Sequence, residues 1–422
     1  MSAQHAMITG STRCPGAKAD RQPMNCAITS GQRPLAIAMP IHSFDPGGVE
    51  KVGLTLASAW HCAGHDVTVV LGRSEGEERA RAPRLTYWLR ECSARTAAFE
   101  TIWMISCLYR YLTTNKVDVL FCPGNTYAIV GAAMRLLLGP SCPPLVLKIS
   151  NDLSRRDMAP PVRAVYRLWL SVQGYVFDRL VGMAAPMHAE IREATGAPAD
   201  RVRVVVNPAL TRERFDRLSR LPQTPKAPWR TRYLAVGRLV RQKNFAMLIH
   251  AFSAQAGPGD TLTIAGEGPE RAELEALAAT LGVADRVHMP GHVAVIDELL
   301  PQADVFVLSS DYEGLPAALI EAMAAGLRII ATDCSSAMSY LLGGGRLGAL
   351  VPVGNHAAFA NAFRTVGELP FDPERSREIA AQFTIENAAD SYLSIMSDVC
   401  QEPRPAPADF LFAHPYFGAA GG

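Results

Sequence analysis

The sequence predicts an α/β fold with two doubly wound parallel sheets. Short apolar stretches typical of buried strands alternate with longer helix-like stretches along most of the 422 residues. That length is enough for two or three domains with sizeable cores. A hydrophobic content of 49% with 19% charged residues is that of a globular protein.

The strands fall into two series separated by a proline-rich stretch. The first series is predicted at residues 35–40, 67–71, 117–122, 145–149, 180–181 and 202–206. The second is predicted at residues 233–236, 261–265, 287–289, 305–308, 328–331 and 350–353. Residues 208–229 lose the hydrophobic period and contain Pro208, Pro222, Pro225 and Pro228, so we interpret them as a linker.

These boundaries predict domains at residues 34–207 and 230–375. A helix is expected at 376–400, from where the chain could cross back to the first domain. Residues 1–33 are rich in Gly, Ser, Pro and charge without an apolar core, which predicts a disordered extension. Residues 401–422 are predicted to be a loose tail.

Cysteine usage and charge indicate the compartment and the kind of partner. The nine cysteines include no C-x-x-C pair, which argues against a zinc site or a disulfide framework and favours a reducing cytoplasm. No apolar run reaches the roughly 18 residues that span a bilayer. The first 230 residues hold 29 Lys and Arg against 18 Asp and Glu, although the whole chain has a net charge of +1. A basic first half favours a phosphorylated partner or an anionic membrane surface.

Residues 74–114 mix arginines with aromatic side chains. Such a stretch could lie on the inner face of an anionic membrane or bind a lipid-linked acceptor. It could equally be a helix with an aromatic core side and a solvated side. Nucleic acid is not expected as a partner, because no recognised module accompanies the charge.

The loops after the strands are where ligands of doubly wound sheets bind. In the first domain, Gly47 and Gly48 form a strand-to-helix turn whose backbone can approach a ligand closely. A later loop brings Asn151 and Asp152 to the same edge of the predicted sheet. These residues are candidates for the side that meets the acceptor of a transferred group.

The segment 303–332 carries the strongest chemical signal. It predicts a strand, a polar loop, a helix at 317–325 opened by Pro316 and ended by Gly326, and a second strand. The helix is apolar all round except for Glu321. Because an unpaired buried carboxylate costs several kcal/mol, either a polar ligand or a buried arginine or backbone group must meet Glu321.

A second carboxylate, Glu313, lies eight residues earlier, just before the helix. The free N–H groups of a helix start suit an anion, and a carboxylate can accept hydrogen bonds from a vicinal diol. A diphosphate joined to ribose and to a sugar fits this arrangement. The alternative is that Glu313 is a solvated loop residue.

Two cations follow the first strand of the second domain, Arg238 and Lys243. Together they could clamp a diphosphate and stabilise the charge on a departing nucleotide, although a solvated loop would also carry such cations. Gly266 follows the next strand and leaves room for a ligand. His292 follows the third strand, where backbone could meet a flat base; a catalytic role for its side chain is disfavoured.

The strings GRLVRQK (237–243), AGEGPE (265–270), GHV (291–293) and EGLPAALIEAMAAG (313–326) resemble the nucleotide-sugar half of retaining GT-B glycosyltransferases. This large family includes bacterial polysaccharide and lipopolysaccharide sugar transferases, and its Glu-x7-Glu signature corresponds to Glu313 and Glu321. The resemblance covers about residues 35–399 and is strong over 233–353. It implies two Rossmann-like domains facing each other across a cleft.

The resemblance also implies roles. Arg238 and Lys243 would bind the donor's diphosphate, Glu321 the ribose hydroxyls, and Glu313 the donor sugar. The backbone of Gly314, Leu315 and Pro316 would bracket phosphate and sugar, with Gly266 and His292 lining the donor site. On the acceptor side would lie Gly47, Gly48 and Asp152. The family needs no metal or cofactor, and no D-x-D element is present here.

One departure concerns the histidine that many members carry after the fourth strand of the first domain. The corresponding loop here contains Asn151 and no histidine. Asn151 would suffice if the departing phosphate takes the acceptor's proton. If a base is required, Asp152 or His42 must supply it.

The predicted function is that of a cytoplasmic, metal-independent glycosyltransferase acting with retention. It would move a hexosyl or N-acetylhexosaminyl group from a nucleotide-diphosphate sugar to a glycan or lipid-linked acceptor in polysaccharide, capsule or lipopolysaccharide synthesis. The alternatives are a sugar-nucleotide epimerase of the same fold and a non-catalytic nucleotide-sugar-binding protein.

Overall fold

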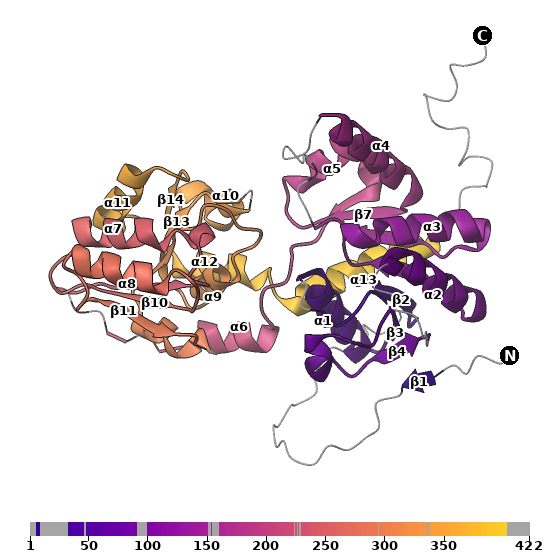
Figure 1. Ribbon diagram of the computed structural model, residues 1–422, viewed down its shortest axis with the longest axis horizontal. Coiled ribbons are helices and arrows are strands. Elements are labelled where there is room, and N and C mark those ends of the chain that lie inside the picture. Colours follow the sequence, from indigo (N-terminus) through magenta and orange to yellow (C-terminus); the bar gives the residue numbers. More distant parts are fainter. Residues whose placement is uncertain are drawn as a thin grey trace, which may run out of the picture. The chain divides into compact units, whose positions relative to one another are not determined.

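The computed structural model describes residues 6–8, 33–45, 48–90, 99–150, 153, 160–222, 224–225, 227, 229–293, 295–335 and 337–402. These residues form two compact units, each with its own sheet (Figure 1). Unit 1 comprises Met1–Val206 together with Ala388–Gly422, and unit 2 comprises Asn207–Asn387. The prediction of two parallel-sheet, Rossmann-like domains is confirmed.

The sheet of unit 1 has the strand order β1-β4-β3-β2-β5-β6-β7-β8. The strands are β1 (Ala6–Ile8), β2 (Ala36–Ile41), β3 (Asp66–Leu71), β4 (Thr86–Leu89), β5 (Val119–Cys122), β6 (Leu145–Lys148), β7 (Arg179–Gly182) and β8 (Val202–Val204). Strand β1 is antiparallel to β4, and every other pair is parallel. The connecting helices are α1 (Gly48–Cys62), α2 (Glu100–Thr114), α3 (Ala128–Leu138), α4 (Pro160–Val176) and α5 (Met187–Thr195).

The sheet of unit 2 is parallel throughout, in the order β11-β10-β9-β12-β13-β14. The strands are β9 (Arg232–Val236), β10 (Thr261–Ala265), β11 (Val287–Gly291), β12 (Val305–Leu308), β13 (Arg328–Thr332) and β14 (Ala349–Val351). The helices of the second half of the chain are α6 (Arg212–Ser219), α7 (Phe245–Gln255), α8 (Arg271–Thr280), α9 (Ala317–Ala324), α10 (Met338–Leu341), α11 (His356–Thr365), α12 (Pro373–Ala381) and α13 (Ile385–Gln401).

Each sheet contains a point where the chain reverses the direction in which it adds strands. In unit 1 this switch lies between β2 and β5, and in unit 2 it lies between β9 and β12. The loops that leave two such neighbouring strands diverge to opposite faces of the sheet, which opens a crevice at the carboxyl ends. Each unit therefore has one place where its strand-end loops are best arranged to bind a ligand.

Helix α13 begins in unit 2, and its residues from Ala388 onward belong to unit 1 (Figure 1). Trp60 of α1 is fully buried and donates its indole N–H to the carbonyl of Ala389 at 3.1 Å. Its ring also packs edge-on against Phe121 and Tyr392, with centroids 5.0 and 6.1 Å away. These contacts fix α13 to the core of unit 1.

Four elements differ from the sequence expectations. Strand β1 lies within the range 1–33, which was expected to be disordered, and β4 lies within the range 74–114. Helix α6 lies in the expected linker 208–229. The expected helix 376–400 is two helices, because Phe383 accepts from the backbone N–H of Ala209 and Ile385 donates to Leu210, which draws the chain out of helical geometry.

We expect the change Trp60→Phe to lower the thermal unfolding midpoint, because it deletes the hydrogen bond to Ala389 and leaves a void in the core. The loss should be about 1–3 kcal/mol. Differential scanning calorimetry measures it. The matched control is Trp229→Phe, since Trp229 is 72% exposed. Equal effects of the two variants would contradict the role given to Trp60.

Candidate functional site

The loops after β9 and β12 meet at the switch point of unit 2. Lys243, at the end of the first loop, forms an ion pair with the Oε1 atom of Glu313 in the second. The Ser310 hydroxyl donates to the same Oε1 atom at 2.8 Å. Both charged side chains are mostly shielded from solvent, with 19% and 11% exposed. Glu313 is therefore not a solvated loop residue.

Further hydrogen bonds hold the same two loops together. The Ser309 hydroxyl donates to the carbonyl of Lys243 at 2.7 Å, and the N–H of Asp311 donates to the carbonyl of Gln242 at 2.9 Å. Asn244, which adopts a left-handed conformation with φ of 48°, donates from its side chain to Asp311 at 2.8 Å. The positions of Lys243 and Glu313 are thus also set by hydrogen bonds between the two loops and do not depend on the ion pair alone.

Helix α9 starts directly after Glu313. Gly314 is exposed, Leu315 is half-buried, and Pro316 is the buried N-cap residue. Pro316 has no side-chain group that could cap the helix start. Since the N–H of Leu319 donates to the carbonyl of Pro316, the N–H groups of Ala317 and Ala318 are those left for an anion beside the Lys243–Glu313 pair.

Glu321 lies in the middle of α9 and is only 8% exposed. Its Oε1 atom pairs with Nη1 of Arg214 at 2.6 Å, so the structure shows the arginine alternative left open by the sequence. Burial raises the pKa of Glu321 above its usual value, and Arg214 opposes that shift. Sequence reasoning missed Arg214 because it lies in the stretch interpreted as linker. The helical spacing of RERFDRLS after Thr211, a good N-cap residue, was the available signal.

The remaining donor-side candidates are placed differently. Arg238 is exposed and forms no ion pair with any residue that the structure describes, and His292 is exposed at the end of β11. A Cβ atom at Gly266 would lie 1.8 Å from the carbonyl oxygen of Gly237, so this glycine allows the loops after β9 and β10 to touch. The structure therefore joins Lys243 with Glu313, places Glu321 against Arg214, and leaves Arg238 and His292 at the surface.

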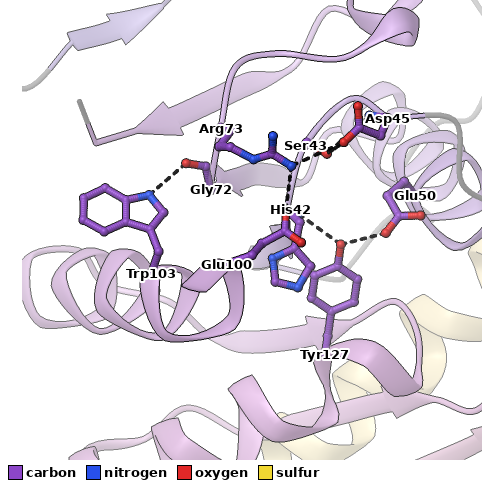
Figure 2. A network of polar contacts seen from close by, with 9 residues as sticks. All are labelled: His42, Ser43, Asp45, Glu50, Gly72, Arg73, Glu100, Trp103 and Tyr127. Carbon is purple, nitrogen blue, oxygen red and sulfur yellow. Dashed lines mark hydrogen bonds and ion pairs between the residues drawn. The ribbon is translucent and has the colours of Figure 1, made fainter. Parts of the chain in front are cut away.

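A second polar centre lies at the switch point of unit 1 (Figure 2). His42 follows β2, and its backbone N–H donates to the phenol oxygen of Tyr127 at 3.0 Å. The phenol in turn donates to Oε1 of Glu50, in the first turn of α1, at 2.9 Å. The rings of His42 and Tyr127 stack with centroids 4.8 Å apart.

The other half of this centre is an ion-pair cluster around Arg73, which follows β3. Its Nη2 atom donates to Glu100 at 2.8 Å and approaches Asp45 at 3.4 Å. Trp103, one turn into α2, donates its indole N–H to the carbonyl of Gly72 at 2.9 Å (Figure 2). The loops after β2 and β3 are thereby tied to the start of α2.

His42 is 7% exposed, and its Nδ1 atom is buried without a hydrogen-bond partner among the described residues. Burial lowers the pKa of His42, although Glu100 and Glu50 oppose that effect, so its ring is neutral at pH 7. At the end of β6, burial also lowers the pKa of Lys148 to about 8. Neither Tyr127 nor Lys148 was singled out from the sequence.

The acceptor-side candidates are only partly described. Gly48 is the first residue of α1 and is exposed, two positions before Glu50. Gly47, Asn151 and Asp152 lie outside the described residues, so their expected roles remain predictions. Within the part of the chain that the structure covers, no group of three or more His, Cys, Asp or Glu could hold a metal ion. No helix in that part is both long and apolar enough to cross a bilayer.

Comparison with known families assigns a class to each half of the chain. Residues 47–208 match the glycosyl transferase 4-like domain, and residues 221–383 match the glycosyl transferases group 1. With two Rossmann-like units, these matches identify the chain as a glycosyltransferase of the GT-B fold.

Its relatives include two proteins of Rhizobium meliloti (strain 1021). The lipopolysaccharide core biosynthesis glycosyltransferase LpsD is 29% identical over 372 residues, covering 85% of this chain and 97% of the relative. The lipopolysaccharide core biosynthesis glycosyltransferase LpsE is 32% identical over 172 residues, which is 39% of this chain and 49% of that relative.

Solved structures share the fold. The lipopolysaccharide outer core galactosyltransferase WaaB in its apo form has a TM-score of 0.70 at 18% identity, covering 86% of this chain and 99% of that one. Anabaena HepE in complex with UDP and glucose has a TM-score of 0.61 at 20% identity, covering 86% of this chain and 100% of the other.

Proposed function

We propose that this glycosyltransferase moves a hexosyl or N-acetylhexosaminyl group, with retention, from a nucleotide-diphosphate sugar. The observation that carries the proposal is the Lys243–Glu313 pair at the switch point of unit 2, beside the uncapped start of α9. A cation and free N–H groups suit the diphosphate, and a carboxylate suits sugar hydroxyls.

In this scheme the bond between the sugar's anomeric carbon and the diphosphate oxygen breaks, and a bond from an acceptor hydroxyl oxygen to the same carbon forms. Lys243 and the first-turn amides of α9 stabilise the charge on the departing nucleoside diphosphate. The departing phosphate oxygen takes the acceptor's proton. Glu313 binds the transferred sugar, and Arg238, exposed on the neighbouring loop, adds a second cation for the diphosphate.

The proposed reaction needs neither a metal nor an organic cofactor, because Lys243 and the helix start supply the positive charge. Turnover that survives a chelator supports this part of the scheme. An epimerase would convert the nucleotide sugar without an acceptor, and a binding-only protein would release no nucleotide. Nucleotide release that depends on a lipid extract as acceptor therefore distinguishes the transferase from both.

The proposed pathway is surface polysaccharide or lipopolysaccharide assembly in the cytoplasm, with a glycan or a lipid-linked glycan as acceptor. Its support is the similarity to LpsD, a lipopolysaccharide core biosynthesis glycosyltransferase, which this chain matches over 97% of that relative's length. On the acceptor side, the polar centre of unit 1 offers neutral His42 at a switch point. We assign His42 to the acceptor hydroxyl, as a hydrogen-bond acceptor that orients it.

We place the membrane contact on α4 instead of residues 74–114. In the earlier stretch Trp88 and Tyr111 are buried and Trp103 is hydrogen-bonded. Helix α4 instead exposes Val162, Val165, Leu168 and Val172 along one face. The helix carries no acidic residue that would repel an anionic lipid surface, and its arginines, Arg163 and Arg167, lie on the opposite side, beside Glu190 and Glu193 of α5.

Donor binding tests the site in unit 2. We expect Lys243→Met and Glu321→Gln to raise the apparent Kd for the best of UDP-, GDP- and ADP-sugars by about ten- to a hundredfold, because each deletes a charged hydrogen-bonding group. Thermal shift titration measures it. The control is Glu378→Gln, an exposed carboxylate on α12. Unchanged binding in both site variants would remove the assignment.

Turnover tests His42. We expect His42→Phe, which keeps a ring against Tyr127, to lower kcat at least about tenfold while donor affinity stays unchanged. Because burial lowers the pKa of His42 from its ordinary value, its ring gains a proton, and the wild type should lose rate, only in acidic solution. Nucleotide-release assays between pH 5 and 8 would show it. A His42→Phe variant with the kcat of the wild type would rule out the proposed role of His42 in turnover.

Vesicle binding tests α4. We expect Val165→Glu with Leu168→Glu to weaken binding to vesicles of phosphatidylcholine and phosphatidylglycerol at least about tenfold, since two apolar contacts are lost and acidic charge is added. Val295→Glu, at an exposed valine of unit 2, is the control. Cosedimentation of the full chain measures the difference. If the wild-type protein does not bind anionic vesicles, the proposed membrane contact of α4 is excluded.

A further inference from the structure

Arg214 lies between two buried carboxylates of unit 2. Its Nη1 atom is 2.6 Å from Oε1 of Glu321, and its Nη2 atom donates to Oδ1 of Asp297 at 3.0 Å. Glu321 belongs to α9, and Asp297 lies on a short turn after β11; each is 8% exposed. Because an unpartnered charge is costly away from water, the Arg214 guanidinium stabilises both acids, and Arg217 adds a second ion pair to Asp297.

The helix that carries Arg214 is fixed at its start. Thr211 caps α6 by accepting from the N–H of Arg214 at 3.1 Å. The N–H of Arg212 donates to Glu386 at 2.8 Å, and its guanidinium donates to Asn387 at 2.6 Å. Arg214 is therefore presented by an anchored helix, and its planar fork has a defined direction.

The pairing leaves part of Glu321 available. Arg214 occupies Oε1, and no residue within the described ranges donates to Oε2. An ionised carboxylate has about four acceptor positions, so Glu321 can still accept hydrogen bonds from a diol. A protonated Glu321 would lose most of that capacity.

Few other charges surround Glu321. Asp297 acts against the ionised form of Glu321, and Arg217, one turn after Arg214 on α6, forms its ion pair with Asp297. Helix α12 brings Arg377 to Gly326, beyond the end of α9. Strand β12 carries no charge, and Arg328 of β13 donates to the carbonyls of Val366 and Leu369. Arg214 is thus the cation in direct contact with Glu321 among the described residues.

We propose that Arg214 is a positioning residue that keeps Glu321 ionised and oriented to bind the ribose hydroxyls of the donor, and so sets the preference for ribonucleotides over deoxyribonucleotides. The inference rests on the proposed function, since it assigns a specificity determinant to the same donor site.

The test compares binding of UDP, GDP and ADP with that of their 2′-deoxy counterparts by isothermal titration calorimetry. We expect the wild type to prefer the best ribonucleotide about tenfold or more. Arg214→Met should reduce that preference to less than about threefold, and its affinity for the ribonucleotide should fall further as the pH is lowered. The pH effect follows because burial raises the pKa of Glu321 and the variant lacks the cation that opposes it.

The control is Arg217→Met, which removes an arginine from the same helix and the same Asp297 without touching Glu321. Arg214→Lys keeps a cation and should recover part of the preference even if Arg214→Met unfolds. Equal preference in the wild type, Arg214→Met and Arg217→Met would overturn the inference while leaving the donor site intact. A wild type that binds none of the six nucleotides would instead overturn the proposed function.

Discussion

The arrangement of unit 2 around its switch point depends on matching each shielded acid with a cation from another element. Lys243 meets Glu313, and Arg214 meets both Glu321 and Asp297. Removing one member would leave its partner charged in a poorly solvated place, a change that typically costs several kcal/mol. These pairs therefore link the loop after β9 to the loop after β12, and α6 to both α9 and the turn after β11.

In both units the polar residues of the candidate site lie at the same place, the switch point of the sheet. A parallel sheet with helices on both faces is apolar throughout, so polar groups collect only at the strand ends. The switch between β9 and β12 holds Lys243 and Glu313, and the switch between β2 and β5 holds His42 and Tyr127. The chemistry of each unit follows from where its topology opens the sheet edge.

Much of this could be predicted from local patterns. Strand β12 is a continuous apolar run, and the spacing of Glu313 and Glu321 about a helix start points to the proposed donor site. The failures were non-local. Helix α6 is short and polar and lies near several prolines, so the segment that contains Arg214 was interpreted as a linker. The partner of His42 lies 85 residues away in sequence, beyond what any periodicity can indicate.

The course of α13 has a consequence for how the protein is made. Unit 2 is a continuous stretch of chain, whereas unit 1 includes residues from Ala388 onward. On the ribosome, Tyr392 cannot pack against Trp60 and Phe121 until all of unit 2 has been synthesised. During synthesis from the N-terminus, the apolar surface formed by Trp60 and Phe121 therefore stays exposed while unit 2 can already fold. A chaperone that covers this surface would act before Tyr392 is synthesised.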